Sequence, residues 1–390
     1  MIDTIILLIE SPFNLRDYQR YGVERLRNHG FDVAIWDVMS LTRPHSIGHY
    51  SPPDALDDKQ LTRFISKKQF KLTISKLIPQ HCIFINMIGC SIRSNFMYNA
   101  LKKHHIQYVE LRTGMIPLPS INKFQQMINS CTLNGILTRL FSKVAQRSIG
   151  LFNKTSLPAC YIVGGRLAKM QCMPKTLDNF DVNLLNLHAL DYDIFLESGP
   201  TLGSKQYAVF LDEFSPYHPD YLMLKNKPVV KPDRYYPYLR QYFDYFEMKY
   251  NVKIIIAAHP RSDYADKPNV FGSREIIYGQ TEQLVKESRF VLLHSSTSIN
   301  YAVLYRKPMI FIECNAYRKN TLFYAPRHMA NILSCKSIVT IDDAKSYELN
   351  NEIEIIDEKA YDNYKEQYIK AKGTPEKNTW DIFSEFIKKH

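Results

Sequence analysis

The sequence predicts an α/β protein made of two doubly wound, Rossmann-like domains. Short apolar runs of the kind that buried parallel strands need recur along the chain, and segments with apolar residues at helical spacing separate them. The alternation pauses near 198–206, where Gly, Pro and Ser are concentrated. We therefore predict a first domain at 1–203, a second at 204–355, and C-terminal helices at 356–390 that cross back to the first domain.

The first half of the chain alternates between strand and helix signals. Strands are predicted at 3–10, 31–38, 82–89, 106–113, 159–165 and 192–197. Helices are predicted near 15–28, 94–104 and 120–150. This order of elements is typical of a parallel sheet with helices on its faces.

The second half begins a new series of the same kind. Strands are predicted at 207–213, 252–260, 275–279, 290–296, 308–313 and 337–343. Helices are predicted near 234–250, from a cap at Thr281, and across the tail from 374 onward, where Trp380, Phe383 and Phe386 lie on one side. The second domain is therefore expected to repeat the architecture of the first.

Length and composition describe a soluble globular protein. The 390 residues suffice for two domains with sizeable cores, and the hydrophobic and charged shares are 45% and 23%. No apolar run approaches the ~20 residues of a membrane span, and the first residues lack the flank and cleavage site of a signal peptide. The seven scattered cysteines form no C-x-x-C pair, so we expect no disulfide framework, no zinc site and a cytoplasmic location.

The net charge of +11 raises nucleic acid as a partner, but no nucleic-acid-binding signature accompanies it, and we expect none. Basic residues cluster at 63–76 and at 137–154, where apolar residues alternate with Arg and Lys at near-helical spacing. Such a segment can lie on an anionic membrane surface, or it can be an amphipathic helix with a solvated face. The segment 137–154 is therefore a candidate for peripheral contact with the inner face of a membrane.

Four consecutive hydroxyl side chains follow the apolar run 290–293. They are Ser295, Ser296, Thr297 and Ser298. A helical segment starts at this point and leads to a second apolar run at 309–312. One or two of the hydroxyls would suffice to cap the helix. Four of them, directly after His294, favour a site that donates hydrogen bonds to the phosphate of a nucleotide.

Two other strand ends in the second half present polar groups. Asp212 and Glu213 follow one apolar run, and His259, Pro260 and Arg261 follow another. Carboxyl ends of strands are where open α/β sheets hold ligands. An imidazole there can donate to a phosphate or transfer a proton. Adjacent residues of an extended chain point in opposite directions, so only one of the two carboxylates can face a cleft, where it would act as a base.

Three further motifs carry weaker signals. The sequence DYD at 191–193 resembles a metal-binding Asp-x-Asp, but it precedes its predicted strand and is interpreted as a loop. The two glycines at 164–165 either admit a substrate to the backbone or form a turn. Glu313, after the strand at 308–313, either binds a ribose or caps a turn. We expect no metal and no cofactor.

The acidic pair, the His-Pro and the Ser/Thr cluster resemble, in this order, the motifs of bacterial sialyltransferases and polysialyltransferases that use CMP-activated sugars on a two-domain GT-B fold. The stretch SINYAVLYRKPMIFIE at 298–313 also resembles capsule Kdo transferases and teichoic-acid glycerophosphotransferases, which use cytidine nucleotides. The resemblance covers about 207–315 and departs at Phe214, where the sialyltransferase pattern has Gly.

The resemblance implies a glycosyltransferase that transfers a CMP-linked acidic sugar, of the sialic, legionaminic, pseudaminic or Kdo type, to a surface glycan or glycolipid. We expect it to be independent of metal, because the donors at three strand ends can neutralise the phosphate. Asp212 or Glu213 matches the general base, His259 the leaving-group residue, and Ser295 and Ser296 the phosphate-binding hydroxyls. The alternatives are a UDP-sugar glycosyltransferase or epimerase, a teichoic-acid-type glycerophosphotransferase, and a non-catalytic nucleotide- or glycan-binding protein.

Overall fold

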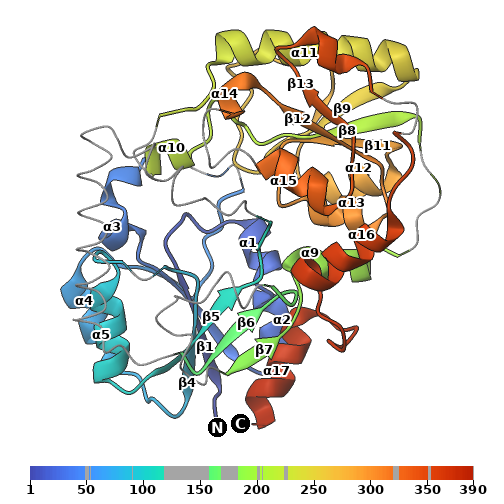
Figure 1. The fold of residues 1–390 in the computed structure, drawn as a ribbon. Coiled ribbons are helices and arrows are strands. Elements are labelled where there is room, and N and C mark those ends of the chain that lie inside the picture. Colours follow the sequence, from blue (N-terminus) through green and yellow to red (C-terminus); the bar gives the residue numbers. More distant parts are fainter. Residues whose placement is uncertain are drawn as a thin grey trace, which may run out of the picture.

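Two parallel sheets, each with helices on both faces, make up the protein (Figure 1). The computed structural model describes residues 1–48, 52, 54–89, 91–117, 158–167, 183–199, 203, 205–223, 227–318, 325–349 and 353–389. The basic segment 137–154 and the helical region predicted near 120–150 lie outside the described residues. The two doubly wound sheets confirm the predicted fold class.

The first sheet has seven parallel strands in the order β3-β2-β1-β4-β5-β6-β7. Their bounds are β1 Thr4–Ile9, β2 Asp32–Asp37, β3 Leu61–Arg63, β4 Cys82–Asn86, β5 Gln107–Arg112, β6 Cys160–Val163 and β7 Leu184–Asn186. From Ile5 to Ile9 the central strand β1 is apolar and buried, as expected of a strand covered on both faces. The direction of progress through the sheet reverses between β1 and β4, which creates a crevice at their carboxyl ends.

Helices cover both faces of the first sheet. They are α1 Leu15–Arg20, α2 Val23–Asn28, α3 Met39–Thr42, the 3-10 helix η1 Pro44–Ser46, α4 Lys67–Ile74 and α5 Asn95–Lys103. The single helix predicted near 15–28 is divided in two at Gly22, whose φ of 58° is left-handed. A Cβ atom there would lie 2.2 Å from the Trp380 ring. Glycine therefore permits both the break and the close packing of the C-terminal helix.

The second sheet has six parallel strands in the order β10-β9-β8-β11-β12-β13. Their bounds are β8 Tyr207–Leu211, β9 Lys253–Ala257, β10 Ile276–Ile277, β11 Phe290–Leu293, β12 Met309–Glu313 and β13 Ile338–Thr340. Its reversal lies between β8 and β11. Two of the three predicted polar strand ends, those of β8 and β11, are therefore neighbours at this reversal, and β9 lies on the other side of β8.

The helices of the second domain are α10 Asp220–Met223, α11 Pro232–Tyr250, α12 Thr281–Glu287, α13 Ile299–Leu304, α14 Asn315–Arg318, α15 Ala325–Ile332 and the 3-10 helix η4 Ala344–Tyr347. On one face of the sheet, α11 buries Phe243 and Phe246 against Phe210 and Phe290. On the other face, α12, α13 and α15 supply the apolar side chains. The strands β8, β11 and β12 are therefore buried along their whole length.

The prediction of a strand at 192–197 is wrong, because this segment is the helix α9, Leu190–Glu197. Tyr192 and Phe195, three residues apart on the helix, pack with ring centroids 5.5 Å apart. Periodicity alone does not separate a short buried strand from a short buried helix. The Asp-x-Asp motif lies in the first turn of α9 and not in a loop.

The C-terminal segment runs from the second domain onto the first (Figure 1). After α16, Glu358–Tyr364, and the π-helical turn η5, Lys365–Ile369, the helix α17, Thr379–Lys389, packs on the core beneath β1. It begins at Thr379 and not at the predicted cap at 374. A Cβ atom on Gly165 would lie 2.4 Å from the Gln367 carbonyl, so this glycine receives the crossing chain and forms no substrate site.

Candidate functional site

A cleft of about 1890 Å³ separates the two domains. Its second-domain wall consists of the residues that follow β8, β9 and β11, together with the start of α12. Its first-domain wall is formed mainly by α1, α2 and α9, with contributions from Asp54 and from the start of α17. The carboxyl ends of β8 and β11 meet at the reversal of strand order, which is where open α/β sheets bind ligands.

The predicted carboxylate Glu213 lies at this reversal. Its Oε1 accepts a hydrogen bond of 2.5 Å from the backbone N–H of Ser295, so the ends of β8 and β11 are joined by one contact. Burial raises the pKa of Glu213 to about 7, with a smaller contribution from the neighbouring Asp212. Both the peptide N–H and the side chain of Ser295 interact with Glu213, and each lowers its pKa.

Asp212 is buried, and both of its oxygens accept hydrogen bonds. Oδ1 binds the N–H of Phe214 at 2.9 Å, and Oδ2 binds the Tyr264 hydroxyl at 2.7 Å and the N–H of His259 at 3.3 Å. Burial raises the pKa of Asp212, and these hydrogen bonds lower it again. Asp212 thereby ties the end of β8 to the end of β9.

Phe214 stands where the resembling motif has glycine. Its φ of 51° lies in the left-handed region that glycine adopts most easily. The backbone of the motif is thus of the kind that glycine favours, although the residue is different. The Phe214 ring is buried and packs edge-on against Tyr264, with centroids 5.1 Å apart.

His259 lines the cleft just after β9. Its Nδ1 accepts the backbone N–H of Arg261 at 3.1 Å, so in the neutral ring the proton is on Nε2. Burial lowers the pKa of His259 to about 2, and His218, whose ring centroid is 4.7 Å away, contributes next. At neutral pH the ring is therefore uncharged and offers one N–H as a hydrogen-bond donor.

Arg261 supplies positive charge to the same wall of the cleft. Its Nη1 donates to Asp220 Oδ1 at 2.9 Å, and Nη2 lies 3.5 Å from Nε2 of His218. Its side chain is 30% exposed. Pro260 also lines the cleft, three residues beyond the end of β9.

Ser296, Thr297 and Ser298 line the cleft. No side chain caps α13, and the Ser296 hydroxyl instead accepts the N–H of Ser298 at 3.2 Å. Within the described part of the chain, the hydroxyls of Thr297 and Ser298 make no hydrogen bond. Capping therefore does not account for the cluster. Because α13 has only six residues, its dipole is small, and the hydroxyls are the main donors here.

Three predicted site residues, Ser295, His294 and Glu313, lie outside the cleft lining, and the last two have partners within the protein. His294 is 1% exposed, with Nδ1 on the Ile312 carbonyl at 2.7 Å and Nε2 at 2.6 Å from the Tyr235 hydroxyl. Glu313 is buried and accepts hydrogen bonds from Arg327 and Thr340. Both act within the protein core, and we do not include them in the proposed ligand site.

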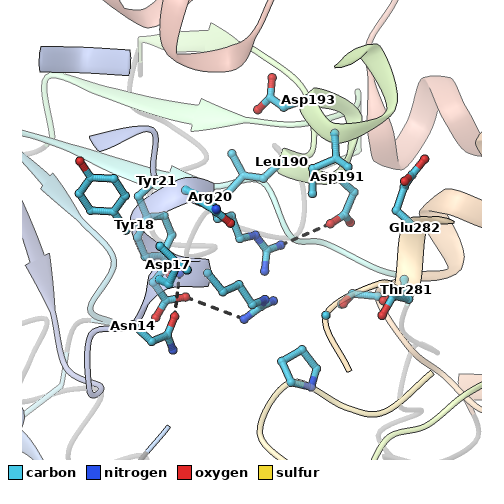
Figure 2. Close-up of a pocket in the computed structure, with 18 of the residues that line it drawn as sticks. Asn14, Asp17, Tyr18, Arg20, Tyr21, Leu190, Asp191, Asp193, Thr281 and Glu282 are labelled. Carbon is cyan, nitrogen blue, oxygen red and sulfur yellow. Dashed lines mark hydrogen bonds and ion pairs between the residues drawn. The ribbon is translucent and has the colours of Figure 1, made fainter. Parts of the chain in front are cut away.

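The opposite wall carries charged residues that we did not predict. Asp17 and Arg20 point from α1 into the pocket, with Asp191 across from Arg20 (Figure 2). The ion pairs are long, at 3.8 Å for Arg16–Asp17 and 3.7 Å for Arg20–Asp191. The same signal that marked the second domain, polar residues directly after a buried strand, is present at 10–20 after β1.

The carboxylates of the Asp-x-Asp motif have partners within the protein. Asp191 accepts the Asn300 side-chain N–H at 2.9 Å and lies near Arg20. Asp193 accepts the backbone N–H of Thr379 at 2.7 Å, at the start of α17. Within the described residues, no group of three or more His, Cys, Asp and Glu side chains is arranged to hold a metal ion.

No described helix is long and apolar enough to cross a membrane.

Several solved structures resemble this chain at low sequence identity. The wall teichoic acid polymerase TagF is 10% identical, with a TM-score of 0.47 over 99% of this chain and 89% of TagF. The calicheamicin glycosyltransferase CalG4 is 10% identical, with a TM-score of 0.45 over 100% and 98% of the chains. A Methanocaldococcus jannaschii UDP-GlcNAc 2-epimerase in complex with UDP-GlcNAc and UDP is 13% identical, with a TM-score of 0.37 over 100% and 99%.

No protein-family model and no curated protein sequence matches the chain. At these sequence identities and TM-scores, the similarity to the solved structures does not indicate the function of this chain. The fold assignment rests on the two sheets themselves, each with the strand order of a doubly wound domain, and on the cleft between them. This two-domain arrangement is the GT-B architecture.

Proposed function

We propose that this protein is a glycosyltransferase that moves a sugar from a nucleotide donor to an acceptor hydroxyl. The proposal rests on one observation. Polar groups from three strand ends of the second sheet converge on one cleft, opposite a charged helix of the first domain. A cleft of this kind has room for a donor and an acceptor together, and closure of the two domains would exclude water.

The donor phosphate is proposed to bind between the hydroxyl cluster and His259. The hydroxyls of Thr297 and Ser298 and the Nε2–H of His259 supply hydrogen bonds, and Arg261 supplies positive charge. These donors stabilise the charge that accumulates on the phosphate as its bond to the sugar breaks. His259 acts here as a neutral donor, since its lowered pKa leaves the ring uncharged at neutral pH.

We propose that Asp212 and Glu213 are positioning residues for this phosphate site. Asp212 fixes the ends of β8 and β9 through three hydrogen bonds, and Glu213 fixes the peptide of Ser295. This division of roles replaces the general base that the sequence predicted at 212 or 213. It is supported by the number of protein partners that the two carboxylates already have.

The proposed donor is a CMP-linked acidic sugar, and the proposed acceptor is a surface glycan or glycolipid. Support for the donor class comes from the order of the acidic pair, the His-Pro and the hydroxyl cluster along the sequence.

The guanidinium of Arg261 and the neutral hydrogen-bond donors around the phosphate site are expected to serve in place of a divalent metal. Transfer is therefore expected to persist in EDTA, whereas loss of activity that Mn²⁺ restores would contradict a metal-free site.

A transfer assay with purified protein tests the function. CMP-, UDP- and GDP-linked sugars are incubated with and without a mixture of bacterial surface glycans, and products are identified by mass spectrometry. We expect a glycosylated product and a free nucleotide only when donor and acceptor are both present. A UDP-sugar converted without any acceptor would instead indicate an epimerase, and transfer of glycerol phosphate from CDP-glycerol would indicate a glycerophosphotransferase.

A further inference from the structure

Asp17 is a nearly buried carboxylate in the first-domain wall of the cleft. The residue is 9% exposed and lines the cleft. Among the described residues, its carboxylate accepts no hydrogen bond, and its ion pair with Arg16 Nη1 is 3.8 Å long. Burial of a carboxylate without hydrogen bonds destabilises the fold. Such a group at the surface of a ligand cleft therefore indicates a role toward the ligand.

The first turn of α1 fixes the position of Asp17. The Asn14 side chain accepts the backbone N–H of Asp17 at 2.8 Å, and Asp54 Oδ2 accepts that of Arg16 at 3.3 Å. A β-bridge between Asn14 and Ala55 holds the two segments together. Because α1 follows β1, at the reversal of the first sheet, this turn projects its side chains toward the second domain (Figure 2).

Charged and titratable groups from three segments face Asp17. They are Arg16 and Arg20 on α1, Tyr21 directly after it, Asp54 from the segment before β3, and Arg261 from the second domain. Burial raises the pKa of Asp17, the guanidinium of Arg16 lowers it most, and Asp54 raises it. Since Arg261 also belongs to the proposed phosphate site, Asp17 lies across the cleft from the group that would leave.

We propose that Asp17 is the catalytic base that removes the proton from the acceptor hydroxyl. This inference rests on the proposed glycosyl transfer and assigns the acceptor to the α1 side of the cleft. Asp212 and Glu213 are on the donor side, and both are bonded to backbone N–H groups. Among the described residues, no backbone N–H binds the Asp17 carboxylate, so its oxygens can accept a proton from a substrate.

The step balances as a single displacement. The acceptor O–H bond breaks, and its proton passes to an oxygen of Asp17. The acceptor oxygen forms a bond to the anomeric carbon, while the bond from that carbon to the phosphate oxygen breaks and leaves its electron pair on the nucleotide. Asp17 then returns its proton to solvent as the products leave. Arg16 acts as a positioning residue that keeps Asp17 ionised.

The variant Asp17→Asn tests the base, because it keeps the shape of the side chain and removes its basicity. We expect the turnover of glycosyl transfer to fall by about 100-fold or more, while the affinity for the donor nucleotide stays within about 2-fold of wild type. Asp57→Asn is the matched control, since this aspartate lies on the same domain with its side chain 83% exposed. Transfer at the wild-type rate by Asp17→Asn would overturn the assignment.

The variant Arg16→Gln provides a second test that leaves the base in place. Without the cation, the pKa of Asp17 rises, so the acid limb of the pH–rate profile moves to higher pH. A limb set by Glu213 would not move, because burial and Asp212 set its pKa. An unchanged limb therefore also overturns the inference. If wild type transfers no sugar at all, the proposed function fails, whereas normal transfer by Asp17→Asn removes only this base.

Discussion

At the scale of single residues, Glu213 is a carboxylate whose burial makes its ionised form unfavourable. Its pKa of about 7 in the folded protein compares with an ordinary value of 4.5. The folded state therefore holds this proton more tightly than the unfolded chain does between these two values. The free energy of unfolding should fall as pH rises from 4.5 to 7, by about 3 kcal/mol at most.

The variant Glu213→Gln should remove this dependence. We expect it to match wild type in stability at pH 4.5 and to exceed it at pH 8, as measured by urea unfolding. Glu348→Gln, which replaces an exposed carboxylate in the same domain, serves as the control. A difference between Glu213→Gln and wild type that is constant across this pH range would show that Glu213 does not titrate with a raised pKa.

The imidazole of His259 should remain neutral in the folded protein at every pH from 8 down to 5. Its pKa of about 2 follows from burial and from the neighbouring His218 and Arg261. Nitrogen NMR of the imidazole should show the tautomer with the proton on Nε2 from pH 8 to pH 5 in the free protein. A titration with a midpoint in this range would contradict the neutral-donor role.

Sequence reasoning identified the residues at strand ends better than it identified their partners. Glu213 and His259 were predicted because each closely follows an apolar run, and both line the cleft. His294 follows such a run equally well, yet Tyr235 and the Ile312 carbonyl occupy its ring nitrogens. These partners are 59 and 18 residues away in sequence, and local patterns carry no information about them.

At the scale of elements, the hydroxyl cluster before α13 should contribute to binding and not to helix stability. Ser298 makes no side-chain cap, whereas Ser66 caps α4 by accepting the N–H of Gln69 at 3.1 Å. We expect Ser66→Ala to lower the free energy of unfolding by about 1 kcal/mol. Ser298→Ala should leave it unchanged and should weaken nucleotide binding, as seen by paired urea unfolding and binding titrations.

Equal losses of stability in the two variants would mean that the cluster is a structural cap after all.

The strands on either side of this cluster were predictable, because continuous apolar runs such as 290–293 permit few other structures. The short helices were harder. Tyr192 and Phe195 pack as a helical pair in a segment whose composition equally suits a strand, so the tertiary contacts of α9 decide its structure.

At the scale of the whole molecule, the C-terminal chain joins the two domains. The Trp380 indole N–H donates a hydrogen bond of 3.0 Å to the carbonyl of Arg20, at the end of α1. The last helix, α17, therefore helps to hold α1, which carries Asp17, in place. The pairing of α1 with α17 joins residues 360 positions apart. The first-domain wall of the cleft was therefore not predictable in detail, although the two-domain architecture was.

The central claim is that the strand ends of the second domain hold a nucleotide phosphate through His259 and the hydroxyl cluster. Calorimetric titration of CMP, CDP, UDP and GDP into wild type, His259→Ala and His259→Gln tests it most directly. We expect a cytidine nucleotide to bind wild type best, and His259→Ala to lose about 1 to 3 kcal/mol of binding free energy. His259→Gln, whose amide N–H replaces the Nε2–H donor, should recover part of that loss. The account is contradicted if none of the four nucleotides binds wild type, or if His259→Ala binds them as tightly as wild type does.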